Sequence, residues 1–267
     1  MLVALQVATT LAASLGACTT GTSADAHERS VKQYELAVGL QAEGNFPSAF
    51  KTLFKAIELD PDNANAHQLL ANLFLMRRAD NPDRHDPLAE KHFGEVLRIE
   101  RGSDQPSKAT IADALNGLGV LRVHQGRHDE AIVSFKEAID EDLFNARAYM
   151  AWGNLGWAYA EKGDYQDSIQ ALRRAVGLNR GFCVGHYRLG KSFLATKAFS
   201  EAEQALTKAL EVDERCASFQ DAWHLRGAAR MGLGYRDDAR SDFERCIELA
   251  PSTEAGTACS RYLEATY

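Results

Sequence analysis

The chain has 267 residues, of which 25% are charged and 45% hydrophobic, and its formal net charge at pH 7 is −7. These values are typical of a globular protein of ordinary composition. The acidic excess and the lack of a basic patch with interleaved aromatic residues argue against a nucleic-acid-binding protein.

Residues 1–17 form an apolar segment without a charged side chain. The segment is too short to span a bilayer with margin, but it suits the hydrophobic region of a secretory signal peptide. Its lack of Lys or Arg favours a start codon upstream of Met1. It ends in Leu-Gly-Ala-Cys, which resembles the bacterial lipobox and implies that Cys18 is lipidated and becomes the mature N-terminus. A plain secretory signal with an incidental cysteine is the alternative.

Residues 18–29 are small and polar, with no apolar period, and predict a flexible tether behind the lipid anchor. Thr19, rather than Asp, follows the cysteine, which in lipoproteins of the enterobacterial type implies export to the outer membrane. Later residues contain no apolar run long enough to cross a membrane. We therefore expect attachment to the outer membrane through the lipid alone, on the periplasmic face.

A pattern of two amphipathic helices joined by a tight turn recurs between residues 30 and 253 and is clearest from Tyr149 to Phe182. Its first helix carries large residues and one glycine on a shared face: Trp152, Leu155, Gly156 and Tyr159. Gly163 ends that helix. The corresponding face of the second helix carries Ser168, Leu172 and Ala175. This pattern resembles the tetratricopeptide repeat of about 34 residues.

Six such units follow one another in register. The resemblance therefore implies an all-α tetratricopeptide-repeat superhelix of six helix-turn-helix repeats at residues 30–253, with the amphipathic segment 254–267 as a capping helix. In the second repeat, the surplus residues 80–87 (DNPDRHDP) predict a surface loop, because Pro and Asp favour turns. About three extra residues before the fourth and sixth repeats each predict one more turn of the first helix.

Four cysteines remain besides Cys18, an even number that suits an oxidising compartment and allows three pairings. The repeat register places Cys183 and Cys216 at neighbouring helix starts in the fifth and sixth repeats. It also places Cys246, near the end of the last repeat, beside Cys259 of the terminal segment. We therefore predict disulfides between Cys183 and Cys216 and between Cys246 and Cys259; four buried free thiols are the alternative.

No residue pattern indicates an enzyme, a metal site or a cofactor. His124 and His128 are four residues apart, but Gly126 ends the helix between them, so they do not share a helix face as metal ligands would. His85 and His92 flank the Pro-rich stretch and are expected at the surface. A phosphate-binding loop and a nucleophile elbow are also missing, so we expect neither a cofactor nor a small-molecule substrate.

The first helices of tetratricopeptide repeats line a concave groove, which the resemblance implies is the partner-binding surface. The groove positions that we assign to binding are Tyr34, Asn72, Asn116, Trp157, Tyr187, Lys191 and His224. Trp157 and Tyr187 are large aromatics on adjacent repeats, and aromatics surrounded by amides suit an extended or helical peptide. The alternative for Trp157 is core packing against the next repeat. The carboxylate clamp of chaperone adaptors is matched only at Asn154 and Arg188, so we do not expect a C-terminal acidic tail as the ligand.

The signal, tether, six repeats and terminal helix together resemble the pilotin lipoproteins of type IV pili, the PilF and PilW family, and most of all the Tgl protein of gliding bacteria. This resemblance implies that the partners are subunits of the secretin PilQ, whose outer-membrane assembly and multimerisation the family promotes. The first alternative is another periplasmic scaffold lipoprotein, for example an adaptor for peptidoglycan hydrolases. The second, from a different class, is an envelope enzyme.

Overall fold

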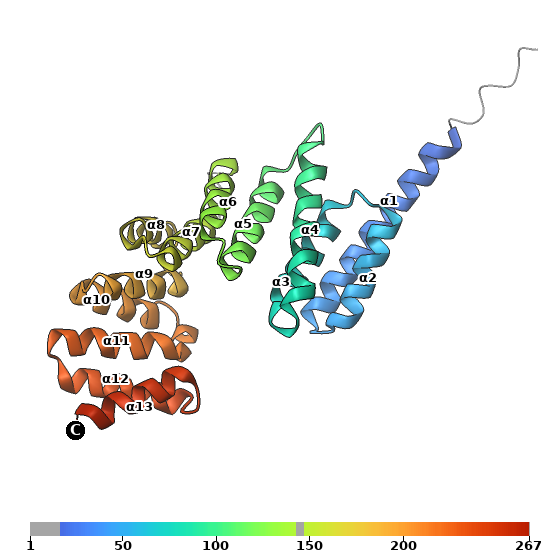
Figure 1. Ribbon diagram of the computed structural model, residues 1–267. Helices are drawn as coiled ribbons and strands as arrows, with labels where there is room; N and C mark the ends of the chain where they lie inside the picture. The colour runs from blue at the N-terminus through green and yellow to red at the C-terminus, as the bar shows by residue number, and fades with distance from the viewer. Residues whose placement is uncertain (1–16, 143–146, 267) are drawn as a thin grey trace, which may run out of the picture. The chain divides into compact units, whose positions relative to one another are not determined.

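The computed structural model describes the backbone of residues 17–142 and 147–266, and side chains within residues 23–265. Within these ranges every regular element is a helix, which confirms the predicted all-α class (Figure 1). None of the described helices is both long and apolar enough to cross a membrane. Residues 1–16 of the predicted signal peptide and the side chain of Cys18 lie outside the described residues.

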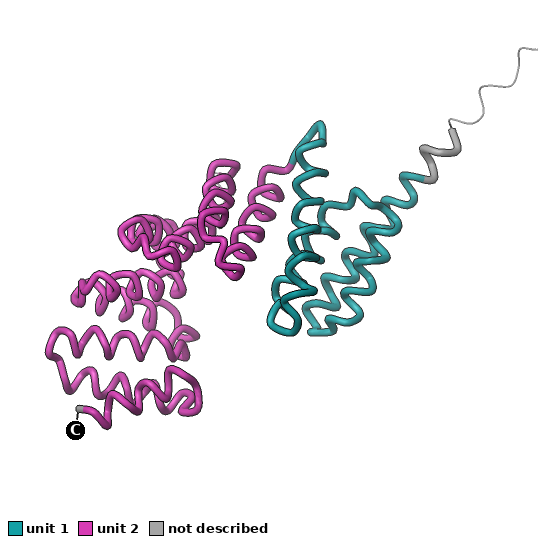
Figure 2. The backbone as a smooth tube through the Cα atoms, in the orientation of Figure 1, with its two compact units in different colours: residues 1–106 teal, residues 107–267 magenta. Residues whose placement is uncertain are grey.

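The chain divides into two compact units, residues 1–106 and residues 107–267 (Figure 2). The helices of the first unit are α1 (Ala17–Ala42), α2 (Phe46–Leu59), α3 (Ala64–Met76), the short 3-10 helix η1 (Arg78–Asp80) and α4 (Pro82–Arg101). They form two helical hairpins, α1 with α2 and α3 with α4. Leu53 and Phe93 are completely buried within this unit and mark its core.

The tether predicted at residues 18–29 is wrong as a flexible segment, because α1 already begins at Ala17. Two ion pairs with four-residue spacing, Asp25 with Arg29 and Glu28 with Lys32, lie along this stretch. Small polar residues without an apolar period suggested disorder. However, a helix that is already packed further along the chain extends without the cost of a new nucleus.

The loop predicted at residues 80–87 is also wrong, because α4 begins at Pro82 and includes Pro87. Proline is well suited to the first position of a helix, where its missing N–H needs no partner. The Asn81 side chain caps this start by accepting a hydrogen bond from the backbone N–H of Arg84 at 3.2 Å. The surplus residues therefore lengthen the second helix of the hairpin.

Two histidines meet in the interior between α3 and α4, which corrects the expectation that His92 lies at the surface. His67 and His92 are 4% and 5% exposed, and their Nδ1 atoms are 2.9 Å apart. The Nε2 atom of His67 also lies 3.1 Å from the carbonyl oxygen of Pro61. Burial lowers the pKa of both rings, that of His92 to about 4, so both are neutral at neutral pH.

The helices of the second unit are α5 (Lys108–His124), α6 (His128–Glu141), α7 (Ala148–Lys162), α8 (Tyr165–Leu178), α9 (Cys183–Ala195), α10 (Phe199–Glu211), the 3-10 helix η2 (Glu214–Ser218), α11 (Gln220–Leu233), α12 (Arg236–Leu249) and α13 (Glu254–Thr266). Consecutive α-helices form four hairpins, each packed on the next (Figure 1). The α13 helix packs on α12 at the end of this stack, where a capping helix was predicted.

Small residues let the two helices of each hairpin approach closely, as the repeat pattern predicts. A Cβ atom added at Gly156 on α7 would lie 2.5 Å from Cγ of Leu172 on α8, which is closer than real contacts allow. Gly190 faces Leu206 in the same way in the next hairpin. Both leucines are completely buried, so these positions are part of the core.

Among the described helices, five of the six hairpin turns use a left-handed backbone conformation, which glycine adopts without a steric cost; the α3–α4 turn, which contains η1, does not. The residues with positive φ at these turns are Gly44, Gly126, Gly163 and Gly234. Between α9 and α10 this position is occupied by Lys197, whose φ is 60°. The turn geometry thus persists where the glycine signal of the sequence is missing.

Both predicted cysteine pairings are present in the structure. Cys183 bonds to Cys216 with 6.3 Å between Cα atoms, and Cys246 bonds to Cys259 with 6.4 Å, both within the usual range for disulfides. The extra residues before the sixth repeat do not lengthen its first helix as predicted. They form η2, a separate element that the first disulfide joins to the start of α9.

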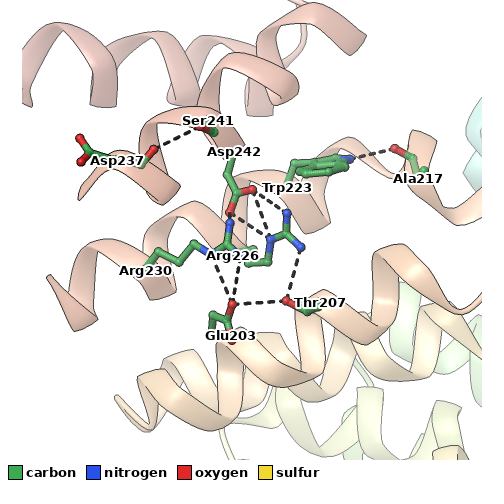
Figure 3. Close-up of polar contacts among 9 residues, drawn as sticks. All are labelled: Glu203, Thr207, Ala217, Trp223, Arg226, Arg230, Asp237, Ser241 and Asp242. Carbon is green, nitrogen blue, oxygen red and sulfur yellow. Dashed lines mark hydrogen bonds and ion pairs between the residues drawn. The ribbon is translucent and has the colours of Figure 1, made fainter. Parts of the chain in front are cut away.

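A buried ionic network joins α10, α11 and α12 (Figure 3). The Arg226 guanidinium donates to Asp242 at 2.7 Å, with side chains 8% and 2% exposed. Arg230 bridges Asp242 at 2.9 Å and Glu203 at 3.1 Å. Arg226 also donates to the hydroxyl of Thr207 at 3.4 Å. Two arginines and two carboxylates thus balance in charge inside the last two hairpins.

Candidate partner-binding groove

Three of the predicted binding residues lie around one cavity of about 300 Å³ in the second unit. Trp157 comes from α7, and Tyr187 and Lys191 come from α9. The complete lining is Trp157, Ala160, Glu161, Val184, Tyr187, Arg188, Lys191 and Phe219. The first helices of consecutive hairpins therefore bring their groove positions together, as the repeat pattern implies.

A row of polar side chains crosses three first helices beside this cavity. Asn154 on α7 donates to Oδ1 of Asn116 on α5 at 3.0 Å. Arg188 on α9 donates through Nη1 to Oδ1 of Asn154 at 2.9 Å and to the carbonyl oxygen of Gly153 at 3.1 Å. All three side chains of the row are half-buried, and burial lowers the pKa of Arg188 to about 10, which leaves it protonated at neutral pH.

Trp157 lines the cavity and contacts Arg188 of this row. The Arg188 guanidinium carbon is 4.8 Å from the centre of the indole ring, a cation–π arrangement. His124 also contacts the indole in an edge-on arrangement, with 5.2 Å between ring centres. The indole N–H donates to Glu161 at 3.2 Å, and Lys191 pairs with the same carboxylate at 3.5 Å. These contacts hold the ring in one orientation.

Trp157 combines the two roles that we considered for it. The ring packs against the buried residues of the α5–α8 core cluster and also faces the cavity. It is half-buried rather than fully enclosed. The residue therefore contributes to both stability and the binding surface, and a single substitution affects both.

Phe219, which we did not assign to the groove, forms one wall of the cavity. Its ring centre is 4.4 Å from that of Tyr187. Burial raises the pKa of Tyr187 to about 12, so its hydroxyl stays protonated. Phe219 directly follows η2, in the extra residues before the sixth repeat. The extra residues were the one feature of the sequence that could have drawn attention to Phe219. Because they lie outside the repeat pattern, the pattern does not predict where its side chain points.

The remaining predicted groove residues do not lie in this cavity. His224 is half-buried beside the stacked rings of Phe243 and Tyr262, with ring centres 6.5 and 5.9 Å away, and burial lowers its pKa. Its environment is explained by packing of the terminal helix. Tyr34 on α1 and Asn72 on α3 belong to the first unit, where Asn72 accepts a 3.5 Å hydrogen bond from its own helix.

Apolar and charged side chains, all within the described residues, line the cavity together. In the described part of the chain, no group of three or more His, Cys, Asp or Glu could hold a metal ion. The cavity combines apolar walls with cations, and the amides of Asn116 and Asn154 lie in the row beside it. Such a surface suits the binding of a protein segment.

Models of the tetratricopeptide repeat match residues 109–146, 134–181, 185–216 and 220–253, together a little more than half of the chain. The Hsp70-Hsp90 organising protein of Plasmodium falciparum is 25% identical over 111 residues, covering 42% of this chain and 43% of that protein. The type IV pilus assembly protein PilF of Pseudomonas aeruginosa is 27% identical over 146 residues, covering 55% and 52%. The chain thus spans about half the length of these curated relatives.

Solved structures show the same fold at low identity. The structure of P. aeruginosa PilF superposes with a TM-score of 0.71 at 20% identity, covering 91% of this chain and all of that one. PilW, described as a widely conserved type IV pilus biogenesis factor, superposes with a TM-score of 0.70 at 19% identity, covering 85% and 96%. Repeat matches, helical hairpins and turn geometry agree: the chain belongs to the tetratricopeptide-repeat family.

Proposed function

We propose that this chain is a six-repeat, pilotin-like lipoprotein of type IV pilus biogenesis. In this proposal its groove binds subunits of the secretin PilQ and promotes their outer-membrane assembly, which supports pilus-based motility. The similarity to PilF, in sequence over 55% of the chain and in fold over 91%, supports the pilus role. The four repeats matched in the second unit are joined in the proposal by two in the first, formed by its two hairpins.

The observation that carries the binding role is the cavity of the second unit. Core residues in a repeat array are already occupied by neighbouring helices, so affinity must come from side chains that stacking leaves accessible. Trp157 and Tyr187 meet this condition on adjacent hairpins, and the rings are held by defined contacts. Ordered aromatic rings lose little conformational freedom on binding, which favours affinity.

The proposal places the protein at the periplasmic face of the outer membrane through lipidated Cys18. Its support is the Leu-Gly-Ala-Cys ending of an uncharged apolar segment. The fatty chains of a lipoprotein together suffice for stable attachment, whereas a single chain gives only marginal binding. The anchor would keep the groove close to the membrane in which a secretin ring is inserted.

The test is secretin assembly in cells whose only copy of the gene carries a groove variant. Trp157→Ala and Tyr187→Ala are expected to abolish heat-stable secretin multimers while monomer remains. Truncating a central aromatic anchor typically costs about 2 kcal/mol or more, roughly thirtyfold in affinity. Tyr165→Ala is the matched control, because this tyrosine is 37% exposed on α8 and does not line the cavity.

Because Trp157 and Tyr187 also contact the core, a third variant separates binding from folding. Val184 is 37% exposed and lines the cavity, so Val184→Arg fills the cavity without removing a packed ring. We expect normal melting and no multimers for this variant. Multimers that form normally with all three variants would contradict a groove site, and multimers that persist without the gene would favour the scaffold alternative.

A further inference from the structure

Arg188 is a half-buried cation that lacks an acidic partner. Its Nη1 atom donates to Asn154 and to the carbonyl oxygen of Gly153, both neutral acceptors. Among the described residues no carboxylate forms an ion pair with it, although acidic residues outnumber basic ones by 37 to 30. The nearby Glu161 is instead engaged by Lys191 and by the indole of Trp157.

This unpaired charge lies at the wall of the apolar cavity. Val184, Tyr187 and Phe219 line the cavity together with Arg188 and Trp157. The face of the indole is covered by the guanidinium at 4.8 Å, so the cation and the rings form one continuous surface. A ligand that enters the cavity therefore meets apolar area and positive charge at the same time.

Burial makes this charge energetically unusual. Taking a cation out of water without a counter-charge is unfavourable, and the pKa of Arg188, lowered to about 10, reflects that cost. An arriving carboxylate would recover it, because attraction strengthens where water is excluded. Arginine presents five N–H donors in a planar fork, and the two hydrogen bonds within the protein use only Nη1.

We propose that the groove recognises an extended protein segment in which an aspartate or glutamate lies next to a bulky apolar side chain. The carboxylate pairs with Arg188, and the apolar side chain fills the cavity beside Trp157, Tyr187 and Phe219. This inference rests on the proposed function in that the groove is taken as the binding surface. It adds the chemistry of the ligand, which applies whichever protein supplies the segment.

The geometry favours an internal acidic residue over a free C-terminal carboxylate. A clamp for a chain terminus needs several cationic and amide donors around one point. Here the side chains at the corresponding positions are Asn116, Val120 and Val184, and Asn116 is already bonded to Asn154. Lys191 is already paired with Glu161, so among the described residues the cavity offers one cation without an ion-pair partner, which matches one carboxylate beside one apolar side chain.

The test uses the purified full chain as bait. Peptides that bind it are selected from a random library of linear heptapeptides displayed on phage. Wild-type protein is expected to enrich sequences with Asp or Glu within two positions of a bulky apolar residue. One enriched peptide is then synthesised in its acidic form and with Asn or Gln in place of the acid. Both are titrated by calorimetry against wild type, Arg188→Gln, Arg188→Lys and the control variant Lys208→Gln.

We expect Arg188→Gln to weaken the acidic peptide by about tenfold or more and to leave the amide peptide nearly unchanged, since losing one partner of a desolvated charge pair is costly. Arg188→Lys should recover part of the loss. Lys208→Gln, at an exposed position on α10 outside the cavity lining, should change affinity by less than about threefold. Melting curves identify any variant that fails to fold. Because the amide peptide reports on the same groove, a fold defect would weaken both peptides equally.

Enriched peptides without a carboxylate, no enrichment at all, or equal loss of both peptides in an Arg188→Gln variant that melts like wild type would overturn the inference. These outcomes are separate from the proposed function. Secretin that binds through a neutral segment would support the function and refute this ligand chemistry. If acidic peptides bind through Arg188 but the groove variants leave secretin assembly unchanged, the ligand chemistry is supported and the proposed function is refuted.

Discussion

Replacing Asp242 by Ala removes the carboxylate that compensates two arginines inside the last two hairpins. Arg226 has no other carboxylate partner among the described residues, and its side chain is 8% exposed (Figure 3). Arg230 keeps Glu203, with 3.1 Å between their charged atoms. Breaking a buried pair by removing one partner typically costs about 3–5 kcal/mol, because the remaining charge stays buried and uncompensated. We expect a loss of this size for Asp242→Ala.

The assay is urea unfolding of the purified full chain, combined with amide hydrogen exchange. Repeat arrays lose stability locally, so the amides of α11, α12 and α13 should exchange faster than those of α5 to α8. Glu248→Ala is the matched control on the same helix. Its ion pair with Arg245 is exposed, and we expect a change within about 1 kcal/mol.

A double variant distinguishes charge burial from lost packing. Replacing Arg226 by Met and Asp242 by Leu removes both charges and keeps apolar volume, which in other proteins is often neutral or stabilising. We therefore expect the double variant to be more stable than Asp242→Ala. If the single variant loses no more than the Glu248→Ala control, or if the double variant is equally unstable, the reasoning from buried charge is refuted.

Three further predictions concern other parts of the molecule. The pKa of His92 is lowered to about 4, and that of His67 is also lowered, so the unfolded chain binds protons more readily than the folded one. The free energy of unfolding therefore has its full value above about pH 6.5 and falls as the pH drops toward 4. We expect His92 to contribute a loss of about 2 kcal/mol between pH 7 and 5, measured in urea unfolding as the difference in pH dependence between wild type and His92→Leu. An equal pH dependence in the variant would contradict this. Replacing both Cys246 and Cys259 by Ser opens a loop with a sequence separation of 13 and should cost about 3 kcal/mol, seen as faster amide exchange in α13; unchanged exchange would show that α13 is held by packing alone. Cys18→Ala should release the protein from membranes into the soluble periplasm, as measured by fractionation and fatty-acid labelling; a variant that stays with membranes, with no label on wild type, would rule out the lipid anchor.

Repeat register could be read from the sequence because small and large residues alternate in a pattern that packing requires. Gly156 predicted that a neighbouring helix packs closely against this position, and the Leu172 side chain of α8 occupies the space that a Cβ atom would need. The same register placed Cys183 opposite Cys216, at equivalent starts of consecutive repeats. Each of these inferences depends on spacing within one repeat or between neighbours, which the sequence displays directly.

Departures from the pattern were misread because composition alone does not determine backbone conformation. Residues 18–29 look disordered, yet they continue a helix that is packed further along. Pro82 looks like part of a loop, but it begins α4, where a proline is favoured. In both cases the adjoining helix, rather than the composition of the segment, determines that the segment is helical.

The sequence by itself predicted the helical hairpins of the second unit, their glycine turns and the cysteine pairing, because these follow from local spacing and a fixed repeat. Only the tertiary structure decided that Asn116, Asn154 and Arg188 form one row, that Phe219 closes the cavity and that His67 meets His92 in the interior. The reason is physical: side-chain direction and the choice of polar partner depend on how separate helices pack. Hydrogen bonds and ion pairs between residues 25 or more positions apart carry no signature in local periodicity.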